Sequence, residues 1–336
     1  MTARGFIAPA VVGLGVVGYG LAGDSTYWTG LLTLAGIYAI AAIGLNLLFG
    51  GAGQISLGHA GFLGIGAWVT GVLTADWGLP WVAGLALSLI IAVLVGLLLG
   101  YAALRIAGHY LALATVAFGL LFAEVMGLQL SSGLYGIPPM DLLGLEVRSQ
   151  TSQLLVVWTV VGLVYTFVRS VQTSRFGRSL AALRDDALAA EAAGVDVARA
   201  KIVVFAISAG LGALSGAMFA PYQASVTDVS FGFNLSIILL HMIVVGGLGS
   251  PGGAVVGALF LVIVPELGRD YERYRLLAYG IVLILAVVMF PRGLAGLGRS
   301  LSGRLFGTPP RWQAPRDGQD GPLQSNDEAL AREVRT

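Results

Sequence analysis

Long apolar stretches follow one another along this chain and are separated by short polar breaks. The hydrocarbon core of a membrane takes about 20 apolar residues of helix, and backbone groups there must be hydrogen-bonded within the protein. The stretches lack the roughly 10-residue alternating segments of a transmembrane β-barrel. We therefore predict an all-α polytopic membrane protein with about ten transmembrane helices, at residues 5–23, 27–49, 60–75, 79–104, 109–130, 153–169, 201–220, 235–250, 252–267 and 276–291.

The composition agrees with this pattern and excludes several classes of function. Only 11% of the residues are charged and 57% are hydrophobic, whereas a soluble domain has roughly a quarter charged residues. The formal net charge of +1 argues against a nucleic-acid-binding surface. Because the chain has no cysteine, disulfides and thiolate metal sites are excluded.

The distribution of Lys and Arg predicts the orientation in the membrane. With the N-terminus in the cytoplasm, ten crossings place fifteen of the nineteen basic residues on the cytoplasmic side, as the positive-inside rule expects. Both termini are then cytoplasmic. We favour an uncleaved first helix over a signal peptide, because Gly20-Leu21-Ala22 is a poor cleavage site.

Two regions follow from these assignments. Residues 1–297 are expected to form a transmembrane domain with a cytoplasmic loop at 170–200, and residues 298–336 a disordered cytoplasmic tail rich in Arg, Pro, Asp, Gln and Ser. No G-x-x-x-x-G-K-[ST] loop occurs, and the two G-x-G-x-x-G stretches, 13–18 and 247–252, do not lie in a βαβ unit. Without a catalytic or metal-ligand motif, we expect no enzyme and no bound cofactor.

The long polar loop offers a candidate interaction element. Asp185 could cap a short Ala-rich helix, because a side-chain oxygen there satisfies free backbone N–H groups, and Gly194 could end the helix. Small residues on one side would let a partner approach closely. A solvated connector is the alternative, and composition favours neither.

Several stretches together resemble a known family. Arg178–Asp186 with Glu191–Val195 is similar to the cytoplasmic loop of ABC importer permeases. Four further signatures follow the same family's order along roughly residues 30–297. They are Gly44–Gly50 with Gly53–Phe62, His109–Thr115, Val245–Gly253 and Phe290–Leu294. The chain as a whole resembles the LivM-like permeases for branched-chain amino acids.

This resemblance implies a permease subunit of the prokaryotic plasma (inner) membrane, paired with a second homologous permease. Two cytoplasmic ATPase subunits, holding ATP and Mg, would drive import, and an extracytoplasmic binding protein would deliver leucine, isoleucine or valine. A related permease for urea, short amides or other amino acids is the alternative. The resemblance also implies that the loop contains the helix that contacts the ATPase, with contact residues Arg184, Asp185, Asp186, Glu191, Ala192, Ala193 and Gly194.

Polar groups within spans usually face the bundle interior or a watery path. Seven glycines between Gly50 and Gly66 favour interrupted helices, whose free backbone groups hold solutes in transporters. Close packing is the alternative there, and packing is our prediction for three other pairs, Gly96/Gly100, Gly212/Gly216 and Gly253/Gly257. The candidate path residues are Asn46, Gln54, Ser56, His59 and Thr115.

A self-sufficient secondary transporter or channel is the alternative from another class. Its ion site would have to use Glu124, the one carboxylate well inside a predicted span, or His59 and His241. No membrane-embedded acidic pair is present, and this alternative would leave the loop at 169–201 unexplained.

Overall fold

The computed structural model describes residues 25–105, 109–129, 133–142 and 144–267, together with isolated positions 13, 15, 18, 280, 281, 283–285, 288, 293 and 294. The predicted spans 5–23 and 276–291 therefore lie outside the described stretches, as does the tail at 298–336. The chain divides into two units, Met1–Gly298 and Arg299–Thr336, and all that follows concerns the first.

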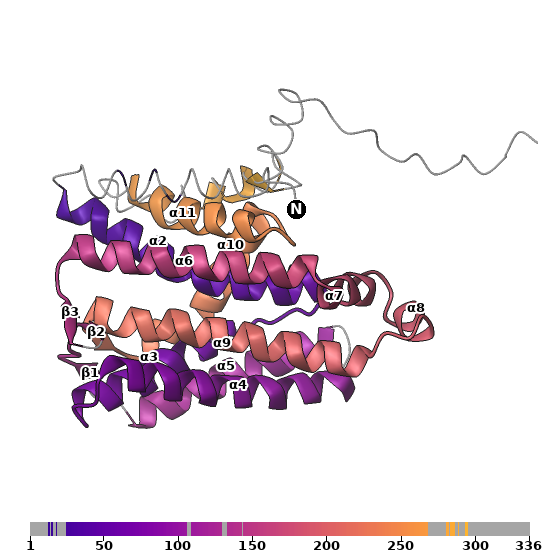
Figure 1. Ribbon diagram of the computed structural model, residues 1–336, viewed down its shortest axis with the longest axis horizontal. Coiled ribbons are helices and arrows are strands. Elements are labelled where there is room, and N and C mark those ends of the chain that lie inside the picture. Colours follow the sequence, from indigo (N-terminus) through magenta and orange to yellow (C-terminus); the bar gives the residue numbers. More distant parts are fainter. Residues whose placement is uncertain are drawn as a thin grey trace, which may run out of the picture. The chain divides into compact units, whose positions relative to one another are not determined.

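Helices make up most of the described chain (Figure 1). The first group is α2 (Thr26–Asn46), the π-helical turn η1 (Leu47–Gly51), α3 (His59–Ala75), α4 (Trp81–Arg105) and α5 (His109–Gln129). The second is α6 (Gln150–Thr173), α7 (Arg175–Asp185), α8 (Ala187–Ala192), α9 (Val197–Gln223), the 3-10 turn η2 (Asp228–Phe231), α10 (Phe233–Gly246) and α11 (Pro251–Leu267). Short strands lie at one end of the long helices, and α7 and α8 lie at the other.

Six of the described helical segments are long and apolar enough to cross a membrane, and α3 and Pro251–Glu266 are shorter apolar helices. These eight coincide with eight of the ten predicted spans, which confirms a polytopic helical membrane protein. The count of ten is not tested, because the other two spans lie outside the described residues. The six are Thr26–Gly51, Trp81–Leu104, Tyr110–Leu128, Gln150–Thr173, Val197–Gln223 and Val229–Gly246.

The centre of the bundle is formed by α2 and α9. In the most apolar 18-residue stretch of each span, 83% of the residues are buried in Thr26–Gly51 and 78% in α9, whereas only 17% are buried in α5. Glycine lets these helices approach closely. A Cβ at Gly96 of α4 would lie 2.6 Å from the Cβ of Ala209, and one at Gly216 of α9 would lie 1.8 Å from the carbonyl oxygen of Leu63. A Cβ at any of the other four glycines of these pairs would also lie less than 3.0 Å from a neighbouring heavy atom: Gly100, Gly212, Gly253 and Gly257. The predicted packing role of these three pairs is confirmed.

A small β structure lies at the end opposite α7 and α8, and the all-α prediction did not include it. Strand β1 (Leu134–Tyr135) pairs antiparallel with β4 (Ser225–Val226), and β2 (Met140–Leu142) pairs antiparallel with β3 (Leu145–Val147). The pairing of β1 with β4 joins segments about 90 residues apart, which no local pattern could indicate.

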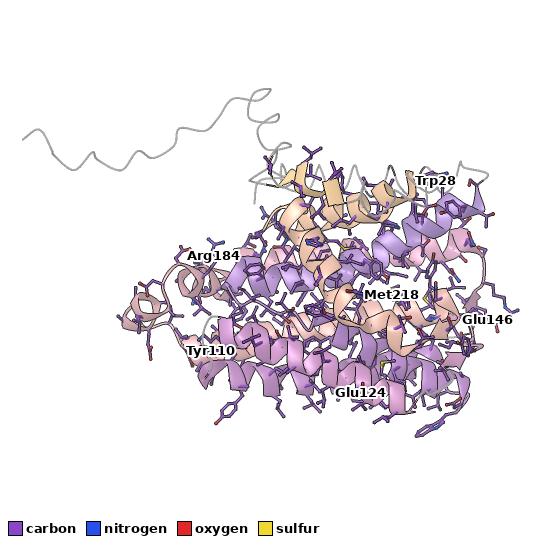
Figure 2. All side chains as sticks on the ribbon, turned by 180° about the vertical axis from the view of Figure 1, so that it is seen from behind. Trp28, Tyr110, Glu124, Glu146, Arg184 and Met218 are labelled. Carbon is purple, nitrogen blue, oxygen red and sulfur yellow. The ribbon has the colours of Figure 1, made fainter. Side chains whose placement is uncertain are left out.

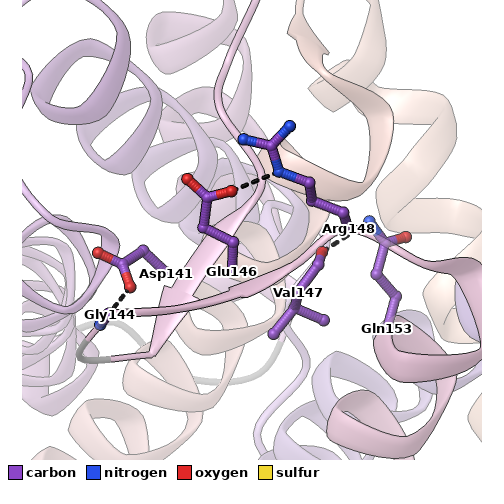
Figure 3. A network of polar contacts seen from close by, with 6 residues as sticks. All are labelled: Asp141, Gly144, Glu146, Val147, Arg148 and Gln153. Carbon is purple, nitrogen blue, oxygen red and sulfur yellow. Dashed lines mark hydrogen bonds and ion pairs between the residues drawn. The ribbon is translucent and has the colours of Figure 1, made fainter.

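Side chains interact at the turn of the β2–β3 hairpin and along β3 (Figure 3). Asp141 Oδ1 accepts a hydrogen bond of 2.6 Å from the backbone N–H of Gly144, whose φ of +94° suits glycine. Glu146 and Arg148 form an exposed ion pair. The hydrogen bond and charge of the Arg148 guanidinium lower the pKa of the Glu146 carboxyl.

Candidate functional site

The chain leaves regular helix between α2 and α3. The last turn of α2 widens into η1, and residues 53–58 have no helical structure before α3 starts at His59. Gly53 has φ +70°, a conformation that other residues rarely adopt. A Cβ at Gly58 would lie 1.8 Å from the carbonyl oxygen of Thr115, so α5 packs directly on this break.

Side chains from two other helices satisfy backbone N–H groups that the break leaves free. Thr115 Oγ1 of α5 accepts a 3.0 Å hydrogen bond from the N–H of Leu57, and Ser236 Oγ of α10 accepts one of 3.0 Å from Ala60. A buried donor without a partner would be costly. Thr115, a predicted path residue, therefore supports the broken backbone.

Asn46 fastens the end of α2 to the turn between α10 and α11. Its Nδ2 donates to the carbonyl oxygens of Gly247 and Ser250, at 3.1 and 2.9 Å. Its Oδ1 accepts a 2.6 Å hydrogen bond from the N–H of Gly249. The amide has four hydrogen-bonding positions and uses three of them here, so Asn46 acts first as a structural connector.

The remaining predicted path residues, Gln54, Ser56 and His59, are buried. Within the described part of the chain, neither the Gln54 amide nor the Ser56 hydroxyl has a hydrogen-bond partner. The two ring nitrogens of His59 likewise have no partner among these residues, and the ring lies edge-on to Phe62. Because buried polar side chains are nearly always paired, Gln54 and Ser56 offer hydrogen-bonding capacity that this fold does not use.

The long polar loop folds into α7 and α8. Asp186 caps α8, since its Oδ1 accepts from the N–H groups of Leu188 and Ala189, at 2.8 and 3.1 Å. The prediction that Asp185 is the cap is wrong, because α7 continues through Asp185 and the chain becomes extended only at Asp186. Gly194, with φ +82°, lies just after the end of α8, as predicted.

The predicted coupling residues divide into two groups. Arg184 and Asp185 form an ion pair of 3.2 Å, and with Asp186 they shape the loop. The segment Glu191–Gly194 is exposed at the projecting tip (Figure 1). Leu188 of α8, which is 80% exposed, was not among the predicted contact residues. A single Leu in an Ala-rich helix is the signal in the sequence that marks it.

Arg184 also joins the loop to the broken helix. Its Nη1 donates a 3.0 Å hydrogen bond to the carbonyl oxygen of Gly50. Nearby, Nε2 of Gln172 in α6 donates a 3.4 Å hydrogen bond to the carbonyl oxygen of Gly249. We name this set the junction: Asn46, Gly50, Gln172, Arg184 and the turn Gly247–Ser250. Sequence reasoning singled out its members separately, apart from Gln172, but gave no sign that they meet.

Comparison with known proteins gives this geometry a family. The family described as "Branched-chain amino acid transport system / permease component" matches residues 27–287. The LivM permease proteins of Salmonella typhimurium and Escherichia coli are each 31% identical over 301 residues, which cover 80% of this chain and 70% of theirs. The LivH permease of Salmonella typhimurium is 25% identical over 288 residues, covering 79% and 93%. No solved structure matches.

The match to the family model includes all eight described apolar helices and both helices of the loop. The chain therefore belongs to the family of permease components of branched-chain amino acid transport systems.

Proposed function

We propose that this chain is the membrane-spanning permease subunit of an ATP-driven importer for leucine, isoleucine and valine. The family match over residues 27–287 carries this proposal. The relatives named LivM and LivH are permeases for branched-chain amino acids. The chain would reside in the prokaryotic inner membrane and pair with a second homologous permease, and an extracytoplasmic binding protein would deliver the solute.

Energy would come from two cytoplasmic ATPase subunits, which would bind ATP and Mg, because this sequence contains no phosphate-binding loop. The tip of the loop suits the contact with an ATPase. Leu188 offers an exposed apolar anchor, Glu191 a charge, and Ala192 and Ala193 allow close approach. This end would face the cytoplasm together with both termini, as the positive-inside rule favours.

The junction would carry movement of the loop into the membrane domain. Arg184 lies at the end of α7 and holds the carbonyl of Gly50 at the end of η1. Four residues earlier, Asn46 holds the turn between α10 and α11. A rigid-body shift of α7 and α8 would therefore pull on two membrane segments at once, which is the kind of element that conformational coupling needs.

The break between η1 and α3 would contribute to the solute path. The Gln54 amide can donate and accept hydrogen bonds, so it suits both the carboxylate and the ammonium of an amino acid. The Ser56 hydroxyl adds a further donor and acceptor, with His59 beside them in sequence. Asn46 and Thr115 would hold the frame of this segment. Burial of all five inside the subunit fits a closed state, in which the path opens only during transport.

A reconstituted complex tests this function. The tagged chain would be extracted with its partners, placed in liposomes with ATP inside, and supplied with the binding protein and labelled leucine. We expect uptake that requires ATP hydrolysis and is inhibited by isoleucine and valine. Inhibition by urea or acetamide alone would favour the related amide permeases. Leucine uptake by this chain alone, driven by an ion gradient, would contradict the importer assignment.

Variants at the loop tip test the ATPase contact. Leu188→Asp combined with Glu191→Lys removes the apolar anchor and reverses the charge on a surface with no packing role. We expect loss of the ATPase from the purified complex and loss of uptake, with normal membrane insertion. Asp76→Lys, a charge reversal at an exposed site near the opposite end, is the control. A double variant that retains the ATPase would contradict this docking surface.

A further inference from the structure

The exposed side of α5 differs from the exposed sides of its neighbours. The exposed positions recur at helical spacing and form one stripe along the helix, which we call the α5 stripe. Most of its members are apolar, but it contains one carboxyl group, that of Glu124 (Figure 2). The stripe consists of Tyr110, Leu113, Ala117, Leu120, Leu121, Glu124, Val125 and Leu128.

The opposite side of α5 is already occupied by α3 and the break. Gly119 packs against Gly58, and the Phe118 and Phe122 rings fill the space beside Gly61 and Gly64. The α5 stripe therefore faces away from the helices that the structure describes, toward lipid or toward another chain.

Lipid is a poor neighbour for Glu124. In the described part of the chain its carboxyl has no hydrogen-bond or ion-pair partner, and in hydrocarbon it would find none. The residue lies five positions before Gln129, or roughly 8 Å along the helix axis from that nearer end. Side chains on a helix lean toward its N-terminus, so the carboxyl is directed away from the nearer surface and cannot easily reach water there.

Two other exposed stripes carry no unpaired carboxyl group. On α4 the stripe is apolar from Leu87 through Leu94 to Leu98. On α6 the hydroxyls of Thr159 and Thr166 donate to carbonyl oxygens of their own helix, at 2.7 and 2.8 Å. Among the six long described spans, α5 has the stripe that contains a carboxyl group.

We infer that the α5 stripe is the surface on which the second permease subunit packs, with Glu124 accepting hydrogen bonds from a donor side chain of that subunit. The inference rests on the proposed function, which supplies the partner. It adds which helix meets that partner and the chemistry at the contact: an apolar helix face with one polar hydrogen-bond donor at the depth of Glu124.

Site-specific photo-cross-linking in the purified complex tests this surface. Benzoylphenylalanine would replace Leu121 on α5 or, as the control, Leu98 on α4; their exposed fractions are matched, at 66% and 68%. We expect a covalent adduct between position 121 and a second permease of this family, identified by mass spectrometry, and no permease adduct from position 98. The reverse pattern, or adducts of position 121 with lipid or with a second copy of this chain, would overturn the inference.

Glu124 itself is tested by two substitutions. Glu124→Gln keeps a hydrogen-bond acceptor and should leave recovery of the second permease near the level of the unmodified chain. Glu124→Leu should lower that recovery severalfold while the chain remains monodisperse in detergent. Equal recovery of the second permease with both variants would show that the Glu124 carboxyl group is not part of the contact.

The absence of cysteine from the chain allows a clean accessibility test. Glu124→Cys should react slowly with a charged thiol reagent in the assembled complex. Fast reaction would place the residue in a water-filled path instead of a subunit contact and overturn the inference. If the unmodified complex contains no second permease at all, the proposed assembly fails together with this surface; if it contains one that cross-links only from α4, the surface alone fails.

Discussion

Arg184 Nη1 donates a 3.0 Å hydrogen bond to the carbonyl oxygen of Gly50, which is 134 residues earlier in the chain. The two residues belong to different parts of the molecule, the polar loop and the end of the first described membrane helix. Gly53 packs against the same side chain, since a Cβ on Gly53 would lie 3.1 Å from Arg184 Cγ. The contact ties the half-exposed Arg184 side chain to the end of η1.

Replacing Arg184 should weaken coupling more than assembly. In Arg184→Gln the charge-assisted bond to Gly50 and the pairing with Asp185 are lost, so we expect ATP-driven uptake to fall about tenfold, equivalent to about 1.4 kcal/mol. ATPase subunits should still co-purify, because the tip of α8 is unchanged. Uptake and ATP hydrolysis in proteoliposomes measure the effect. Arg178→Gln, an exposed arginine of the same helix, is the control; equal losses in both variants would contradict a specific role for Arg184.

Asn46 should be needed for stability of the membrane domain. Asn46→Ala leaves the N–H of Gly249 without its acceptor, which costs about 1–3 kcal/mol, and removes the side-chain donor to the carbonyl oxygens of Gly247 and Ser250. These two oxygens keep backbone donors, the N–H groups of Ser250 and Ala254. Thermal unfolding in detergent should therefore occur at a clearly lower temperature. Asn234→Ala removes an exposed asparagine and provides the comparison. Similar unfolding temperatures for both variants would show that the junction tolerates loss of the amide.

Gly58 should not tolerate a side chain. The Cβ of Gly58→Ala would lie 1.8 Å from the carbonyl oxygen of Thr115, so α5 would have to move away from the break. Overpacking of this kind costs about 1–3 kcal/mol or more. The yield of monodisperse protein and its unfolding temperature measure the effect. Gly162→Ala in α6, where nothing lies within 4 Å of the added Cβ, should be neutral or slightly stabilising; equal behaviour of the two would contradict the packing.

The ion pair of the β2–β3 hairpin should persist in mild acid. The pKa of Glu146 is lowered by Arg148, so the carboxylate keeps its charge, and its contribution to the stability of the folded state, below the ordinary pKa of a glutamate. That contribution is present above the pKa of the unfolded chain and disappears as the pH falls through the lowered value. The Glu146 carboxyl titration can be followed by NMR in detergent. In Arg148→Gln we expect the pKa to rise; an unchanged value would exclude the pair as its cause.

The sequence by itself determined the class of the protein. Only 11% of its residues are charged, and helix-length apolar stretches of this kind are stable in a membrane. Local composition also placed eight of the helices, the short helix within the loop and Gly194 at its end. The order of family signatures indicated the permease family before any tertiary contact was known. These features depend on neighbouring residues, which a sequence displays directly.

The tertiary structure alone decided which residues meet. Packing between segments far apart in sequence produces three of these contacts. They are the hydrogen bonds of Asn46 with Gly249 and of Arg184 with Gly50, and the pairing of β1 with β4. The same holds for the contrast between Thr115, which supports the broken backbone, and Gln54, whose amide is buried without a partner. The physical reason is that hydrogen bonding and burial depend on distances between segments, whereas hydropathy depends only on the residues within one segment.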